Sequence, residues 1–197
     1  IGIGTNYADH AAEMNSEHPS EPLIFLKPST SVIGPNDAIA LPSQSTMVHH
    51  EAELAVVIGR FCKDVPRERV ADVILGYTCA NDVTARDLQK ADGQWALGKG
   101  FDTFCPLGPW IQTDIDVSDL GVTAYVADQL RQSGSTKDLI FSVVDIVSFV
   151  SHQMTLLPGD VILTGTPAGV GPILPGDEVE VSIEGIGSLV NRVEQAR

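Results

Sequence analysis

A short run of apolar residues, Leu54 to Ile58, is ended by Gly59. Its length and its β-branched side chains favour a buried strand over a helix. Side chains on a strand alternate between faces, so Glu51 and Glu53 lie on the same face, with Cα atoms about 6.5–7 Å apart. Two buried carboxylates repel each other and are costly to desolvate. The pattern therefore predicts either a compensating group, namely a cation, a basic side chain or a shared proton, or a strand that begins in solvent with both acids hydrated.

A second apolar run, residues 73–83, also has the character of a strand, and Asp82 stands at its end. An acid at the end of a buried strand is well placed to contribute to a site. Together with Glu51 and Glu53 it forms a set of three carboxylates, which suits a hard divalent cation such as Mg²⁺ or Mn²⁺ better than Zn²⁺. The third acid favours a metal site over a solvated strand start.

The remaining pattern mixes strands with a few short helices. Residues 142–154 place Val143, Ile146, Val147 and Val150 on one stripe, which predicts an amphipathic helix. Strand-like residues 178–183 and 188–193 close the chain. Two Leu-Pro-Gly-Asp segments suit type II turns that open strands. These elements predict a β-rich α+β fold.

Two segments after Asp82 carry candidate functional groups. Residues 84–90 predict a helical turn with Thr84 as its N-cap, which would place Arg86 and Gln89 on one face close to Asp82. Residues 92–110 are rich in glycine and aromatic residues and predict a long loop. Lys99 stands between two glycines there, where the backbone can approach a ligand closely.

Three other polar residues are candidates with competing interpretations. His10 and Glu13 fall three apart in an Ala-rich segment, residues 5–15, that predicts a short helix. They form either a solvated surface pair or a carboxylate-oriented general base. Lys27 ends an apolar run and either extends to solvent or faces a pocket. The Thr166 hydroxyl, with the backbone N–H groups of residues 164–171, could bind an anion.

Composition narrows the class of protein. The 197 residues are 43% hydrophobic, which suffices for one large domain spanning residues 1–197. The net charge of −14 argues against nucleic acid as a partner. No apolar run is long enough to predict a membrane span. The three cysteines lack metal-ligand spacing and are expected to be reduced, as in a cytoplasmic protein. Because the sequence begins at Ile1 without Met, we expect a further N-terminal part outside this chain.

Several motifs occur together in a familiar order. They are Asn6-Tyr-Ala-Asp-His, Phe25-Leu-Lys-Pro, Glu51-Ala-Glu-Leu-Ala, Asn81-Asp-Val-Thr-Ala-Arg-Asp, the Lys99 segment, and Leu157-Pro-Gly-Asp-Val-Ile-Leu-Thr-Gly-Thr-Pro. In this order the chain resembles the fumarylacetoacetate hydrolase family, in particular its acylpyruvase and oxaloacetate decarboxylase branch. The resemblance runs from Asn6 to about Val193. It implies a β-rich mixed sandwich-like roll with short flanking helices, and a homodimer.

The resemblance also implies roles for individual residues. The family's metal ligands fall on Glu51, Glu53 and Asp82, and the metal is Mg²⁺ or Mn²⁺. Its catalytic groups fall on His10 and Glu13, a dyad carried on a mobile lid, and on Lys99. Its substrate-binding residues fall on Lys27, Arg86, Gln89 and Thr166. One departure is Thr5, where an Arg commonly precedes the Asn-Tyr pair; this bears on substrate choice.

The implied substrates are 2-oxo acids with a second carbonyl or carboxylate nearby. We expect a metal-dependent C–C bond hydrolase acting on acylpyruvate-type 2,4-dioxo acids, because the His10–Glu13 pair could activate water. Oxaloacetate decarboxylation and 2-hydroxyhepta-2,4-diene-1,7-dioate isomerisation are alternatives on the same site. A β-rich binding domain with structural Ca²⁺ is the non-enzyme alternative, but it would leave His10, Glu13 and Lys99 without a role.

Overall fold

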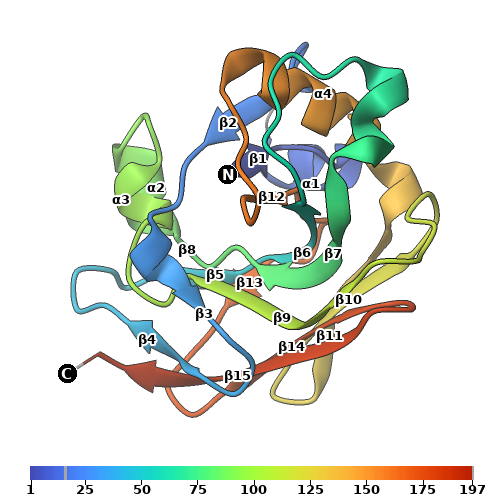
Figure 1. Ribbon diagram of the computed structural model, residues 1–197. Helices are drawn as coiled ribbons and strands as arrows, with labels where there is room; N and C mark the ends of the chain where they lie inside the picture. The colour runs from blue at the N-terminus through green and yellow to red at the C-terminus, as the bar shows by residue number, and fades with distance from the viewer. Residues whose placement is uncertain (16, 197) are drawn as a thin grey trace.

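The computed structural model describes residues 1–15 and 17–196, and their regular secondary structure is mainly β-strand (Figure 1). The strands form three sheets. The first sheet has the order β2-β1-β12-β6-β7-β9-β3. Its strands are β1 (Gly2–Gly4), β2 (Leu23–Phe25), β3 (Val32–Ile33), β6 (Ala52–Ile58), β7 (Ile74–Asn81), β9 (Cys105–Gln112) and β12 (Val161–Leu163).

The second sheet comes mostly from the C-terminal half of the chain, and the third combines strands from both halves. The second has the order β11-β10-β14-β15-β4, and the third has the order β13-β5-β8. Their strands are β4 (Ala38–Leu41), β10 (Gly121–Val126), β11 (Gln129–Ser135), β14 (Glu178–Ile183) and β15 (Gly187–Gln195), then β5 (Val48–His50), β8 (Thr84–Ala85) and β13 (Gly171–Pro172). The predicted β-rich α+β fold is confirmed.

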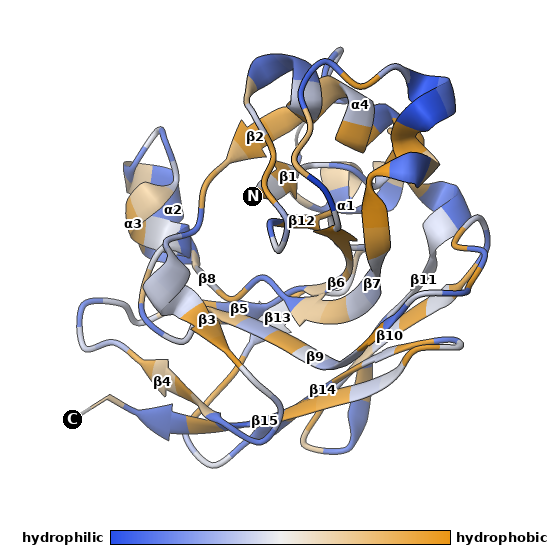
Figure 2. Cartoon of the chain, viewed as in Figure 1, coloured by the Kyte–Doolittle hydropathy of each residue, from blue (hydrophilic) through white to orange (hydrophobic). Residues whose placement is uncertain are grey.

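The main core lies between the first two sheets and under the longest helix. Every residue of β6 is buried, as the apolar run of the sequence predicts, and β6 pairs with β7 and β12 in antiparallel fashion. Leu54 and Val56 of β6 pack in one apolar cluster with residues of β10, β14 and helix α4 (Val143–Gln153). Figure 2 shows the hydrophobic residues concentrated on β6, β7 and β14. This packing fixes the strand that carries Glu53.

Helix α4 forms where its apolar stripe predicts it. Ser142 and Asp145 make a reciprocal capping box at its N-terminus, which satisfies two backbone N–H groups. The other helices are short: α1 (Ala8–Glu13), α2 (Arg86–Ala91), α3 (Ala96–Lys99), and the 3₁₀ turns η1 (Ser29–Ser31), η2 (Arg67–Asp72) and η3 (Thr136–Asp138). Among the described residues, no helix has both the length and the apolar character needed to cross a membrane.

Two local predictions are wrong. Thr84 is not an N-cap: it lies in β8, its hydroxyl donates to the Asp82 carbonyl oxygen (2.8 Å), and α2 begins two residues later. Residues 92–110 are not one loop either, because they contain α3 and the start of β9. Lys99 is the last residue of α3, so a helix rather than a flexible loop holds it. The sequence did not predict α3 and the start of β9, because turn-forming glycines stand there beside residues that pair over long range.

Candidate active site

Three buried carboxylates meet where β6 and β7 lie side by side. Glu51 immediately precedes β6, Glu53 is its second residue, and Asp82 immediately follows β7. The antiparallel register brings the start of β6 against the end of β7, and Asp82 N donates to the Glu51 carbonyl oxygen (2.9 Å). One oxygen atom from each side chain lies within 4.8 Å of the others. The structure thus brings together all three predicted metal ligands.

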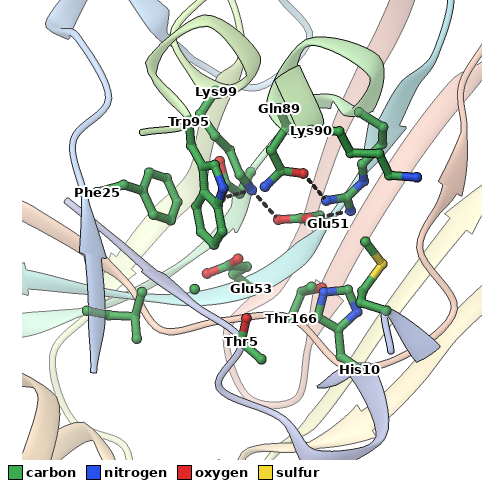
Figure 3. A pocket seen from close by; sticks show the side chains of 15 residues that line it. Thr5, His10, Phe25, Glu51, Glu53, Gln89, Lys90, Trp95, Lys99 and Thr166 are labelled. Carbon is green, nitrogen blue, oxygen red and sulfur yellow. Dashed lines mark hydrogen bonds and ion pairs between the residues drawn. The ribbon is translucent and has the colours of Figure 1, made fainter. Parts of the chain in front are cut away.

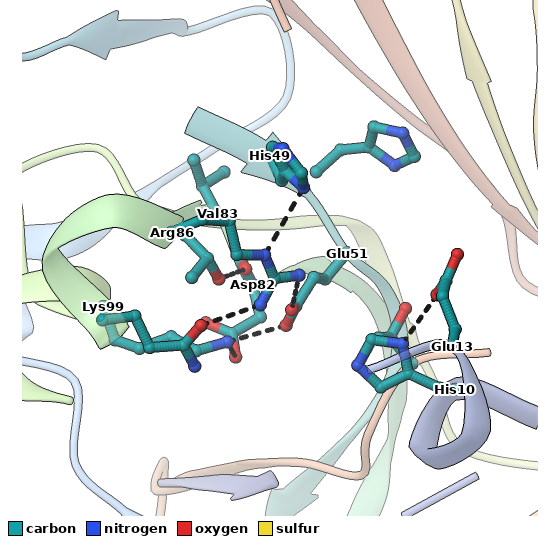
Figure 4. A network of polar contacts seen from close by, with 12 residues as sticks. His10, Glu13, His49, Glu51, Asp82, Val83, Arg86 and Lys99 are labelled. Carbon is teal, nitrogen blue, oxygen red and sulfur yellow. Dashed lines mark hydrogen bonds and ion pairs between the residues drawn. The ribbon is translucent and has the colours of Figure 1, made fainter. Parts of the chain in front are cut away.

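Two lysines and an arginine pair with two of the three acids, and Figure 4 shows Arg86 and Lys99 beside Glu51 and Asp82. Lys99 Nζ donates to Glu51 Oε2 and to Asp82 Oδ2, each at 2.7 Å. Arg86 pairs with the other oxygen of Glu51. Lys27 Nζ donates to Asp82 Oδ1 and to the Lys99 carbonyl oxygen, each at 2.6 Å. Lys27 therefore lies behind Asp82, outside the cavity lining, and orients this carboxylate rather than facing a ligand.

Burial and charge act differently on the two glutamates. Burial alone would raise the pKa of Glu51, but Arg86 and then Lys99 outweigh it and hold this pKa well below its usual value. Burial raises the pKa of Glu53 well above its usual value, and repulsion by Asp82 and Glu51 adds to the increase. The Gly165 N–H, which donates to Glu53 Oε2 (2.6 Å), acts in the opposite direction. Glu53 is the acid whose charge is least compensated by the protein.

The predicted dyad is present on α1. His10 Nδ1 lies 3.1 Å from Glu13 Oε2, and the His10 side chain is buried against the cavity. The other Glu13 oxygen accepts from Gly169 N–H (3.1 Å). Asn6, just before α1, donates to the Thr164 carbonyl oxygen (2.7 Å) and so ties the start of this helix to the segment that carries Thr166. The histidine is thus held in place by its carboxylate and by two chain segments.

Arg86 and Gln89 lie one turn apart on α2, as the spacing predicts. Arg86 donates to Gln89 Oε1 (2.9 Å), so the cation and the amide form a fixed pair beside Glu51. Arg86 Nε also contacts His49 Nδ1 at 3.4 Å. Burial, and next the charge of Arg86, lower the pKa of His49 to about 4, so His49 is neutral at pH 7 and accepts this hydrogen bond.

These groups line a single cavity of about 260 Å³ (Figure 3). Its apolar wall includes Phe25 and Trp95, whose rings meet edge to face at 5.5 Å. The polar lining faces this wall. It consists of Thr5, His10, Glu51, Glu53, Asp82, Arg86, Gln89, Lys90, Lys99 and Thr166. The cavity can hold a small molecule with one charged end near the acids and an apolar part against the aromatic rings.

Comparison with known proteins shows which family the chain resembles. The profile described as Fumarylacetoacetate (FAA) hydrolase C-terminal matches residues 1–194, nearly the whole chain. The chain belongs to the fumarylacetoacetate hydrolase family. A protein of Mycobacterium tuberculosis is 56% identical over 98% of this chain and 74% of its own length.

Solved structures of fumarylacetoacetate hydrolase family relatives share the fold. The 2-hydroxyhepta-2,4-diene-1,7-dioate isomerase of Mycobacterium marinum is 53% identical, with a TM-score of 0.92 over 98% of this chain and 73% of the other. The fumarylpyruvate hydrolase of Pseudomonas aeruginosa, solved with Mn²⁺ and pyruvate, is 35% identical, with a TM-score of 0.92 over 98% of this chain and 88% of the other. Both relatives are enzymes, but their reactions differ.

The residues of this fumarylacetoacetate hydrolase family member fit a divalent metal. All three converging side chains are carboxylates, the donors that hard cations prefer. Among the described residues no lysine or arginine pairs with Glu53, and burial, followed by the charges of Asp82 and Glu51, raises its pKa well above the usual value. Glu51, Glu53 and Asp82 could therefore hold the metal, and Lys99 would share two of these acids with it.

Sequence reasoning missed two features of this family member's site. Gln132, on β11, is fully buried and contacts Thr166, although it stands 34 positions away. Trp95 lines the cavity in a left-handed backbone conformation (φ 66°) that no local pattern signals. Both depend on contacts between distant segments. The sequence signal for such a strand is an alternation of apolar and polar residues, and it is weak along 129–135, where Leu130 is the one apolar side chain.

Proposed function

We propose that this chain is a Mg²⁺- or Mn²⁺-dependent C–C bond hydrolase acting on acylpyruvate-type 2,4-dioxo acids. One observation carries the proposal: the carboxylates of Glu51, Glu53 and Asp82 line the same cavity as the carboxylate-oriented His10. The relative solved with Mn²⁺ and pyruvate supports both the metal and the 2-oxo acid. A structural Ca²⁺ site would not need a histidine–glutamate pair beside it.

The reaction adds water across a C–C bond and yields a carboxylic acid and pyruvate. A divalent cation, when bound, stabilises negative charge that develops on the 2-oxo oxygen. His10 accepts a proton from the attacking water, and Glu13 keeps the imidazole in the orientation and tautomer that this transfer requires. The water then forms a bond to the distal carbonyl carbon, and the C–C bond electrons move toward the pyruvate half.

The charged residues of the cavity serve the second half of the reaction. The carbon released from the broken bond needs a proton. The ammonium group of Lys99 can supply this proton. Burial alone would lower the pKa of Lys99, but Asp82 and Glu51 outweigh burial and raise it. Arg86, with Gln89 fixed beside it, presents a cation and an amide to the polar end of the substrate. The aromatic wall of Phe25 and Trp95 receives the apolar part of the acyl group.

Isomerisation of a 2-hydroxydienoate is the second candidate, and the 53% identity to an isomerase supports it. This reaction moves a proton and needs no attacking water. Decarboxylation of oxaloacetate needs no attacking water either. A panel of acylpyruvates, oxaloacetate and a 2-hydroxydienoate, assayed with Mg²⁺, with Mn²⁺ and with a chelator, separates the three. We expect the acylpyruvates to be cleaved fastest and all turnover to stop with chelator. Turnover that persists with chelator, or none on any substrate, would reject the proposal.

A further inference from the structure

One buried histidine, His50, has no part in the reaction proposed for the cavity. It is fully buried in β5, and it lies outside the cavity lining although it directly precedes Glu51 in the sequence. In the small third sheet it stands opposite Gly171 of β13. Direct contact with a ligand in the cavity therefore does not explain a histidine at this position.

The contacts of Gln132 determine which ring nitrogen of His50 carries a hydrogen. His50 Nδ1 lies 3.1 Å from Gln132 Oε1. The same Oε1 accepts from Ala52 N–H (2.9 Å), while Gln132 Nε2 donates to the Pro167 carbonyl oxygen (2.7 Å). Oε1 is thus the carbonyl oxygen of the amide, which can only accept hydrogen bonds. His50 Nδ1 must therefore carry the hydrogen and donate it to Gln132.

The other ring nitrogen of His50 contributes nothing to the stability of the fold. Nε2 is buried, and among the residues that the structure describes it has no hydrogen-bond partner. A buried polar atom without a partner costs free energy of folding, and an apolar side chain at position 50 would avoid this cost. Packing alone thus does not account for the histidine, whereas the hydrogen bond from Nδ1 to Gln132 does.

The hydrogen bond from His50 is continued to the cavity by Gln132. Gln132 Nε2 donates to the Thr166 hydroxyl (2.7 Å), and this hydroxyl lies 2.8 Å from the Ala52 carbonyl oxygen. Thr166 lines the cavity, and because its hydroxyl accepts from Gln132, it turns a lone pair toward a ligand there. If the Gln132 amide turned over, it would offer Thr166 an acceptor instead of a donor and reverse this arrangement. By donating to Oε1, His50 disfavours the reversed amide.

We infer that His50 is a positioning residue that orients the Thr166 hydroxyl for the substrate, acting through Gln132. The inference rests on the proposed function, because it requires the 2-oxo acid to lie in the cavity that Thr166 lines, and it adds a residue outside that cavity. The role requires a hydrogen-bond donor at the position of Nδ1. The amide of Asn can place a donor there, whereas the longer Gln side chain carries its amide toward the position of Nε2.

The first test compares His50→Asn with His50→Gln, two amide variants of similar polarity. Calorimetry measures the Kd of pyruvate on the Mn²⁺-loaded proteins. We expect His50→Gln to weaken pyruvate binding about fivefold, the usual effect of one lost hydrogen bond, and His50→Asn to change it less than about twofold. His152→Gln is the matched control, because His152 is an exposed histidine of α4 outside the cavity, with Nδ1 2.8 Å from the Ser148 carbonyl oxygen.

A double-mutant cycle separates positioning from a general loss of structure. Thr166→Val removes the hydroxyl and keeps the β-branched shape. In this background His50→Gln should change the pyruvate Kd less than about twofold, because the group that His50 orients is gone. A loss that persists in full in the Thr166→Val background would overturn the inference, and so would equal Kd values for His50→Asn and His50→Gln.

Nitrogen-15 NMR of the histidine rings tests the same hydrogen bonds without a ligand. Burial lowers the pKa of His50, so the ring is neutral at pH 8 and carries one hydrogen. Free neutral histidine carries it mostly on Nε2, whereas we expect it on Nδ1 of His50, and Gln132→Leu should weaken this preference. The signal is assigned by its absence in His50→Asn. A hydrogen on Nε2 of His50 in the wild type would contradict the inference. Neither binding nor NMR requires turnover, so both outcomes are independent of the turnover panel.

Discussion

The side-chain amide of Gln132 donates to the Thr166 hydroxyl at 2.7 Å, and the same hydroxyl lies 2.8 Å from the Ala52 carbonyl oxygen. The orientation of the amide is fixed, because Gln132 Oε1 accepts from Ala52 N–H (2.9 Å) and Nε2 donates to the Pro167 carbonyl oxygen (2.7 Å). The Thr166 hydroxyl accepts from Gln132 and so donates to Ala52. Its remaining lone pair, not its proton, is therefore free for a ligand.

Gln132 should accordingly be needed to position Thr166. Gln132→Leu leaves Ala52 N–H and the Pro167 carbonyl without their buried partner, so we expect a loss of about 2–3 kcal/mol in the free energy of unfolding. We also expect a higher KM, because the segment that carries Thr166 loses an anchor. Denaturant unfolding and steady-state kinetics measure the two effects. Gln112→Leu, at a partly exposed amide with two long hydrogen bonds (3.4 and 3.5 Å), is the control. Equal results for both variants would contradict this role.

The two glutamates of the acid cluster should respond in opposite ways to neutralisation. Glu51→Gln removes a buried charge from between Arg86 and Lys99, so we expect a loss of about 3–5 kcal/mol in the free energy of unfolding. Glu53→Gln removes a charge that burial and its acidic neighbours already disfavour, so the metal-free protein should be at least as stable as the wild type.

Both variants should lose Mn²⁺ binding, because each removes one of three ligands. Electron paramagnetic resonance titration measures free Mn²⁺ directly, and urea unfolding without metal measures stability. A Glu53→Gln variant that binds Mn²⁺ as tightly as the wild type would remove Glu53 from the metal site. A strongly destabilised metal-free Glu53→Gln variant would show that the charge balance described for the cluster is wrong.

The three cysteines should be unreactive in the folded protein. Burial raises the pKa of Cys79 to about 12 and that of Cys105 to about 11, and it also raises the pKa of Cys62. The thiolate is the reactive form, so at pH 8 its fraction is very small at the two strand cysteines. We expect an aromatic disulfide reagent to label three thiols in denaturant and almost none in buffer. Rapid labelling of Cys79 or Cys105 in buffer would show that β7 or the start of β9 opens readily.

The sequence predicted the acid cluster because local rules decide it. The alternation of side chains on a strand places Glu51 and Glu53 on one face, and the end of the next apolar run places Asp82 beside them. Helix α4 was predictable for the same reason, from its apolar stripe. The predicted pair of His10 and Glu13 also rests on spacing within one short helix. In each case the residues that form the feature lie within a few positions of one another in the sequence, or at the end of a strand that is easily identified from the sequence.

The features that local rules did not predict depend on long-range pairing. Thr84 has the composition of an N-cap but is taken into β8 by its pairing with β5. Lys27 reaches Asp82, 55 positions away, and only the fold shows that it lies behind this acid. Gln132 belongs to the second sheet and Thr166 to the segment after β12 of the first, so no local pattern links them.

We propose that His10 activates water in a metal-dependent C–C bond cleavage. This proposal is tested most directly by measuring acylpyruvate hydrolysis and oxaloacetate decarboxylation on the same proteins at saturating Mg²⁺. His10→Ala should lose hydrolysis by a factor of about 10²–10⁴, the usual contribution of a general base, whereas decarboxylation, which needs no water, should fall less. Glu53→Ala should abolish both reactions. Equal losses of both reactions in His10→Ala, or full activity in Glu53→Ala, would contradict the account.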